Sequence, residues 1–200
     1  MLLCGGAARR FGGGKLLAGT PPLAERAARN LKGAIARVVA VAPPGDAPLV
    51  ELLERCGCEV LASDRTSRGM GASLAAAIEA CASADGWIVA LGDMPAIRPA
   101  TLGRVAEALA EGATIAAPVD GSGRRGHPVG FSKALRSELL ALDGDVGARP
   151  LLERHANALT RIVVDDPGIF IDIDSAEDLQ KLGSDPGFQR GVNWPVRGST

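Results

Sequence analysis

Short, continuously apolar runs alternate along this chain with segments that carry apolar residues at helical spacing. A strand that is apolar at every position suits a parallel sheet that is covered on both faces. The apolar runs are residues 2–6, 37–42, 58–62, 86–93, 114–119 and 161–166. The helical segments are residues 21–35, 48–57, 71–83, 99–112 and 132–142. This alternation predicts an α/β fold with an open parallel sheet and helices on both faces.

The size and charge of the chain limit its classes of function. Its 200 residues suit one core, which we place in a domain of residues 1–182. Residues 183–200 lose apolar periodicity and are rich in Gly, Pro and Ser, which predicts a loose tail. The net charge of −1 gives no general attraction to nucleic acid or membrane. Four cysteines without a metal-binding spacing read as reduced thiols, so we expect a cytoplasmic protein.

A glycine-rich basic stretch, "CGGAARRFGGGKLL", follows the first apolar run at residues 4–17. In an open parallel sheet ligands bind beyond the carboxyl ends of the strands. Glycines let backbone N–H groups approach an anion, while Arg9, Arg10 and Lys15 supply positive charge from an exposed loop. Lys15 is followed by Leu16, not Ser or Thr, so this is not a Walker A loop. The stretch therefore predicts a phosphate site, or alternatively a flexible loop whose cations are only solvated.

Asp93 ends the apolar run 86–93, where its carboxylate would emerge beside the glycine-rich stretch. A carboxylate in that place suits Mg²⁺, which uses few protein ligands and completes its shell with water and substrate phosphates. The alternative is a turn-forming Asp two residues before Pro95.

A second group of acids lies in "GIFIDIDSAEDL", residues 168–179. Read as a strand, this segment puts Asp172 and Asp174 on one face, because strand side chains alternate. Two like charges on one face need a cation or a hydrogen-bond network. Alternatively, Asp172 is solvated and Asp174 helps to cap a helix that begins at Ser175, where "SAED" resembles a capping box.

Six motifs together resemble a known family. They are "GGAARRFGGGK", "RGMGASL", "LGDMPAI", "GHPVGF", "GDVGARPLL" and "DIDSAEDL". Their order resembles that of the nucleotidyltransferases of molybdenum cofactor biosynthesis, with the cytidylyltransferases nearer than the guanylyltransferases. The resemblance implies a Rossmann-like nucleotidyltransferase fold with a mostly parallel sheet, Mg²⁺ as cofactor, an NTP donor, and molybdopterin or its molybdenum-bearing form as acceptor. It also allows a molybdoenzyme or its chaperone as a further partner.

The same resemblance assigns roles to individual residues. Catalytic roles fall to Arg10, Lys15 and Asp93, and Mg²⁺ ligation falls to Asp93 with one or both of Asp172 and Asp174. The predicted nucleotide-binding residues are Cys4, Gly5, Gly6, Ala7, Arg10, Gly12, Gly13, Lys15, Gly71 and Ser73. The predicted acceptor-binding residues are Arg124, Arg125 and His127. For Gly71 and Ser73 a plain helix start is the alternative, and for His127 a structural role in its loop. Arg68 stands where the cytidylyl group often has an acid.

The choice of base depends on which motif is weighed. Most motifs resemble the cytidylyltransferases, whereas "LLCGG" at the start is closer to the Leu-Ala-Gly-Gly of guanylyltransferases. We expect CTP, with GTP as the alternative. Two other functions remain open: a sugar or polyol phosphate nucleotidyltransferase, and a non-catalytic carrier of the molybdenum cofactor. The carrier would keep the basic loops but would not need the carboxylates.

Overall fold

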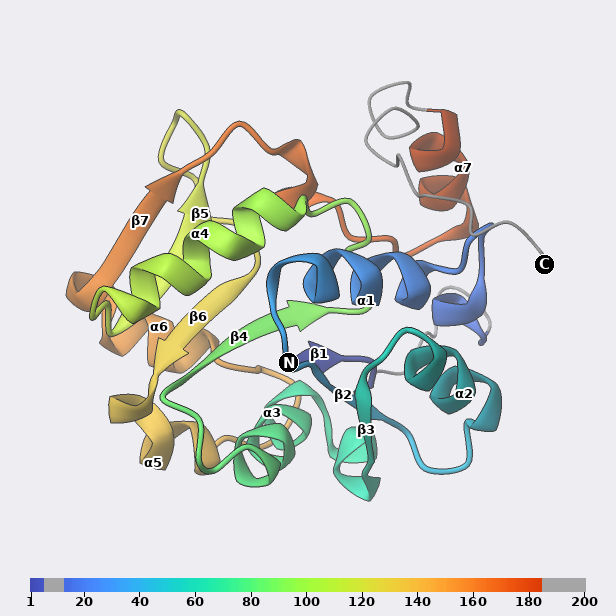
Figure 1. Ribbon diagram of the computed structural model, residues 1–200, viewed down its shortest axis with the longest axis horizontal. Helices are drawn as coiled ribbons and strands as arrows, with labels where there is room; N and C mark the ends of the chain where they lie inside the picture. Colours follow the sequence, from blue (N-terminus) through green and yellow to red (C-terminus); the bar gives the residue numbers. More distant parts are fainter. Residues whose placement is uncertain (6–12, 185–200) are drawn as a thin grey trace.

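Seven strands form one sheet in the order β3-β2-β1-β4-β6-β5-β7 in the computed structural model, which describes residues 1–5 and 13–184 (Figure 1). The strands are β1 (Leu2–Leu3), β2 (Val39–Ala42), β3 (Glu59–Ala62), β4 (Gly86–Leu91), β5 (Ile115–Val119), β6 (Val129–Ser132) and β7 (Leu159–Val163). All neighbouring strands are parallel except β6, which is antiparallel to both β4 and β5. The predicted mostly parallel α/β fold is confirmed.

Helices cover both faces of this sheet, as the continuous apolar runs predict (Figure 1). The α-helices are α1 (Leu23–Ala34), α2 (Ala47–Arg55), α3 (Met70–Ala80), α4 (Pro99–Ala110), α5 (Arg136–Leu140), α6 (Arg149–Arg154) and α7 (Ala176–Ser184). One core cluster joins α1, α2 and α4 to sheet residues such as Ala40 and Ala90. The other joins α3, α5 and α6 to the alternate residues, such as Val41 and Val89. Each buried strand therefore supplies side chains to both cores.

Two parts of the chain differ from the sequence prediction. β6 was not predicted, because its four residues include a glycine and directly follow the cis His127–Pro128 peptide. Segment 168–174 is not a strand: Pro167–Phe170 forms the short 3-10 helix η5, and residues 171–174 have no regular structure. The physical reason is a close approach, because a Cβ on Gly168 would collide with the Ala96 carbonyl oxygen.

The C-terminal part of the described chain begins with the predicted capping box. The Ser175 backbone N–H donates to Asp178 Oδ2 at 2.9 Å, and the Asp178 N–H donates to Ser175 Oγ at 3.2 Å. The helix α7 that follows runs to Ser184, so the predicted boundary at residue 182 falls inside it. None of the described helices has the length and apolar character needed to cross a lipid bilayer.

Asp166 is a buried carboxylate that ties β7 and η5 to the start of α4. Its side chain accepts hydrogen bonds from Arg98 N at 2.9 Å, Thr101 Oγ1 at 2.6 Å and Gly168 N at 3.0 Å. Only 5% of the residue is exposed. Because the donors from Thr101 and Gly168 are buried, the carboxylate stabilises the fold at this junction.

We predict that Asp166→Ala lowers the free energy of unfolding by about 3 kcal/mol, since it leaves buried donors without an acceptor. Urea denaturation followed by circular dichroism measures the change. Asp165→Ala is the matched control, because the Asp165 side chain is exposed and its contact with Arg98 uses the backbone carbonyl. Equal losses in the two variants would contradict this account of Asp166.

Candidate functional site

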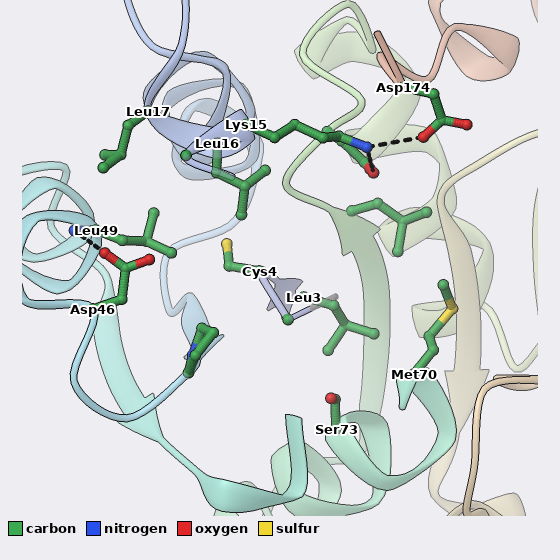
Figure 2. Close-up of a pocket in the computed structure, with 15 residues that line it drawn as sticks. Leu3, Cys4, Lys15, Leu16, Leu17, Asp46, Leu49, Met70, Ser73 and Asp174 are labelled. Atoms are coloured by element: carbon green, nitrogen blue, oxygen red, sulfur yellow. Dashed lines mark hydrogen bonds and ion pairs between the residues drawn. The ribbon is translucent and has the colours of Figure 1, made fainter. Parts of the chain in front are cut away.

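A cavity of about 280 Å³ opens at the carboxyl end of β1 (Figure 2). Its walls come from the residues that follow β1, β2 and β4, from the 3-10 helix η1 (Lys15–Leu17), and from the first turn of α3. In Figure 2 Lys15 lies on one side of the cavity and Ser73 on the other. The cavity is therefore where the parallel sheet predicts a ligand site.

Lys15 lies between two acidic side chains that also line this cavity. Its Nζ lies 2.8 Å from Asp93 Oδ2 and 2.9 Å from Asp174 Oδ1. Only 9% of Lys15 is exposed, so the expectation of an exposed loop cation is wrong. Burial lowers the pKa of Lys15, but the hydrogen bonds and charges of Asp93 and Asp174 raise it by more, and the net shift is upward. The amine is therefore positively charged at neutral pH.

Backbone contacts bring the two acids together from segments far apart in the sequence. The Ile173 N–H donates to the Asp93 carbonyl oxygen at 3.0 Å, which sets Asp174 beside Asp93. Gly168 packs on the Ala96 carbonyl, so the segment before Asp174 follows the loop after β4 closely. The pairing of Asp174 with Asp93 thus depends on close packing between two loops.

Asp93 and Asp174 could together hold a divalent metal. They are hard oxygen donors that converge on one positively charged nitrogen, which is the arrangement that Mg²⁺ or Mn²⁺ would use. Within residues 1–5 and 13–184 no group of three or more His, Cys, Asp or Glu side chains is placed to bind a metal. A metal here would need oxygens from water or substrate as well. Asp172, the third predicted ligand, is exposed and does not line the cavity.

The predicted nucleotide-binding residues fall into four groups. Cys4, Gly5, Lys15 and Ser73 line the cavity. Gly13 has φ +99 and stands just before the cavity-lining Gly14. Gly71 faces the other way, because its N–H donates to the Gly144 carbonyl at 2.7 Å and a Cβ there would lie 2.6 Å from the Asp143 carbonyl oxygen. Gly6, Ala7, Arg10 and Gly12 lie outside the described residues, as does Arg9.

Gly5 and Ser73 lie close together where the residues after β1 approach the start of α3. A Cβ on Gly5 would lie 2.9 Å from Thr66 and 3.2 Å from Ser73 Oγ, so no larger residue fits without a shift. Ser73 is buried, and its hydroxyl donates to the Gly69 carbonyl at 2.9 Å. Both residues therefore shape the cavity through packing as well as lining it.

Two of the predicted acceptor residues, Arg124 and His127, have defined surroundings in the structure. The guanidinium of Arg124 stacks 3.6 Å from the centre of the Phe170 ring, and its Nε lies 3.5 Å from Asp120. Burial, and then the positive charge of Arg125, lower the pKa of His127, while Asp93 and Asp172 raise it by less. His127 is therefore neutral at neutral pH, and its buried Nδ1 has no hydrogen-bond partner in the part of the chain that the structure describes.

Sequence reasoning gave no role to Arg149, although it lies within the quoted motif "GDVGARPLL". Burial, and then the positive charge of Arg149, lower the pKa of Arg125, so the two side chains lie within electrostatic range of each other. The motif also packs on the cavity wall, since a Cβ on Gly147 would lie 2.9 Å from Met70 Sδ. The two arginines are 24 positions apart in the sequence, and no local sequence pattern indicates that they lie within electrostatic range of each other.

Comparison with known proteins identifies the family pattern and the fold. The sequence pattern of the MobA-like NTP transferase domain matches residues 1–159. No curated protein sequence matches the chain.

Solved structures share the fold over nearly the whole chain. Rv0371c from Mycobacterium tuberculosis H37Rv is 25% identical with a TM-score of 0.78, covering 90% of this chain and 95% of its own. Rv0371c was also solved in complex with manganese, at a TM-score of 0.73 and 23% identity, covering 90% of this chain and 94% of its own. A nucleotidyl transferase from Methanothermobacter is 23% identical with a TM-score of 0.79, covering 96% and 97%. A CMP:2-keto-3-deoxy-manno-octonic acid synthetase in complex with CTP is 13% identical with a TM-score of 0.69, covering 90% of this chain and 94% of its own.

Proposed function

The chain belongs to the MobA-like NTP transferase family, and on that premise we propose that it transfers a nucleoside monophosphate from CTP to the phosphate of molybdopterin or its molybdenum-bearing form, releasing pyrophosphate. The observation that carries the proposal is the convergence of Asp93 and Asp174 on Lys15 at the edge of the cavity. A carrier that only held the cofactor would not need two carboxylates beside a phosphate site.

In the proposed reaction a terminal phosphate oxygen of the acceptor attacks the α-phosphorus of the NTP in line. A new P–O bond forms, the bond between the α-phosphorus and its bridging oxygen breaks, and pyrophosphate leaves with that electron pair. The attacking phosphate is already ionised near neutral pH, so this step needs no general base. The protein therefore has to align two anions and offset their charge.

The residues of the site divide this work. Lys15, with Arg10 from the same glycine-rich stretch, would neutralise the triphosphate. Asp93 and Asp174 would hold Mg²⁺, which supplies charge neutralisation at the phosphate oxygens when bound. The manganese complex of Rv0371c supports a divalent metal in this fold, although that structure was solved for another protein.

The arginines on the predicted acceptor side support an acceptor that carries a phosphate. The positive charge of Arg149 lowers the pKa of Arg125, and an anion bound within reach of both would offset this like-charge repulsion. Arg124 is held in place by Phe170 and Asp120, so it would present its charge with little loss of side-chain entropy. We therefore keep Arg124, Arg125 and His127 as the acceptor side and add Arg149.

We also propose that residues 1–182 form the transferase domain and that residues 183–200 serve as a tail, with a cytoplasmic location. A molybdoenzyme or its chaperone would receive the product. The family match over residues 1–159 and the burial of Leu182 in a core cluster with Leu23 and Ile173 support a single domain that reaches residue 182.

We predict that CTP is used in preference to GTP, because most of the motifs resemble the cytidylyltransferases. The competing signal, "LLCGG", ends in Cys4, Gly5 and Gly6, and the first two of these line the cavity. Incubation with equal CTP and GTP plus molybdopterin, with the dinucleotide identified by mass, measures the preference. A mainly guanine product would show that the opening segment decides the base and would reverse this choice.

A further inference from the structure

Lys15 occupies the point at which the two acidic side chains converge. One nitrogen lies 2.8 Å from an oxygen of Asp93 and 2.9 Å from an oxygen of Asp174. Asp93 follows β4, and Asp174 follows the 3-10 helix η5. In the sequence they lie 78 and 159 positions from Lys15, which contacts both. Among the described residues, Lys15 is thus a cation that contacts both carboxylates.

A divalent metal bound by the same two oxygens would take the electron pairs that now accept hydrogen bonds from the amine. Metal–oxygen bonds for Mg²⁺ are about 2.1 Å long, and the amine lies 2.8 and 2.9 Å from the same oxygens. A metal bound there would therefore lie within about 5 Å of the amine. Two cations that close repel each other strongly in a partly buried site. The amine and the metal therefore compete for the same two oxygens.

The surroundings of Lys15 allow its side chain to leave without disturbing the backbone. Leu16 and Leu17 are partly buried and pack on the core cluster that contains α1 and α2, which anchors η1. Lys15 itself has four flexible methylene groups, and the cavity lies directly beside it. A rotation about its side-chain bonds would carry the amine from the acids into the cavity.

We propose that Lys15 is an internal counter-ion that a divalent metal displaces, and that the displaced amine turns into the cavity toward the triphosphate. The second half of this statement rests on the proposed function, whereas the displacement does not. The exchange couples the two ligands: metal binding releases the cation that the nucleotide needs. It also keeps the two acids from repelling each other before the metal arrives.

Lysine labelling measures the exchange directly. The chain has four lysines, Lys15, Lys32, Lys133 and Lys181, so an amine-reactive reagent followed by peptide mass spectrometry reports each one. The whole protein is labelled with and without saturating Mn²⁺ alone, and Mn²⁺ binding is followed in parallel by electron paramagnetic resonance. Lys133 is the internal control, because it also pairs with an acid, Asp85 at 2.7 Å, but is exposed, and Asp85 precedes β4 whereas Asp93 follows it.

We expect Lys15 to be protected without metal and to react severalfold faster with Mn²⁺, while Lys133 does not change. In Asp174→Asn we expect faster Lys15 labelling without metal, because one of its two partners has lost its charge, and a smaller response to Mn²⁺. Unchanged Lys15 labelling while Mn²⁺ binds would overturn the exchange, and so would a failure to bind Mn²⁺ at all.

This experiment separates the exchange from the proposed reaction. Unchanged labelling in a protein that still forms the dinucleotide would refute the exchange and leave the transferase assignment standing. Metal-dependent labelling in a protein that releases no pyrophosphate would support the exchange and refute the assignment.

Discussion

Asp93→Asn should slow nucleotidyl transfer by on the order of a thousandfold at saturating Mg²⁺, because a metal-binding carboxylate contributes several kcal/mol in the transition state. The fold should survive the change. Asparagine has nearly the same shape, and the hydrogen bond from Ile173 N uses the backbone carbonyl of residue 93, which is kept. Pyrophosphate release under single-turnover conditions measures the rate, and circular dichroism checks the fold.

The matched control for this prediction is Asp85→Asn. Asp85 also pairs with a lysine, Lys133 at 2.7 Å, but it precedes β4 whereas Asp93 follows it, so the two acids belong to opposite ends of the strand. Its replacement should leave the rate nearly unchanged. A near-normal rate in Asp93→Asn would remove Asp93 from the proposed metal site.

Lys15→Ala should reduce kcat/KM for the NTP by about a hundredfold, since it removes a cation that would offset charge on the triphosphate. It should also lower the melting temperature without metal, because Asp93 and Asp174 lose the positive charge between them. Addition of Mn²⁺ should recover part of that loss in Lys15→Ala, since the metal restores a cation between the acids. Steady-state kinetics and thermal unfolding with and without Mn²⁺ measure these effects.

Lys133→Ala is the control for this variant, because its exposed ion pair with Asp85 should contribute little to stability or rate. A lower melting temperature with unchanged NTP affinity in Lys15→Ala would make Lys15 a structural residue and remove it from the triphosphate site.

Part of the fold and of the site could be predicted from sequence because the signals are local. Continuous apolar runs indicate buried parallel strands, and Asp93 follows such a run directly, so its position at the carboxyl edge of the sheet was predictable. Lys15 belongs to a glycine-rich stretch that follows the first apolar run, so its place at the same edge of the sheet was also predictable. β6 gave no such signal, because it is short, contains Gly130 and runs antiparallel between two longer neighbours.

The remaining features depend on contacts between distant segments. Asp174 was proposed from strand alternation, which is wrong, and it reaches the site through the packing of Gly168 on Ala96 and the bond from Ile173 to Asp93. Lys15 was expected to be exposed, and its burial between two acids required the same packing. These are long-range approaches of backbone to backbone, which leave no periodic pattern in the sequence.

A panel of acceptors tests whether the site joins a nucleotide to a phosphorylated acceptor. The protein is incubated with CTP, Mg²⁺ and either molybdopterin, a sugar phosphate, a polyol phosphate or no acceptor, and pyrophosphate and products are identified. Our account predicts pyrophosphate and a cytosine dinucleotide with molybdopterin alone. Molybdopterin bound without pyrophosphate release would indicate a carrier, and product formation with a sugar or polyol phosphate instead would contradict the proposed acceptor.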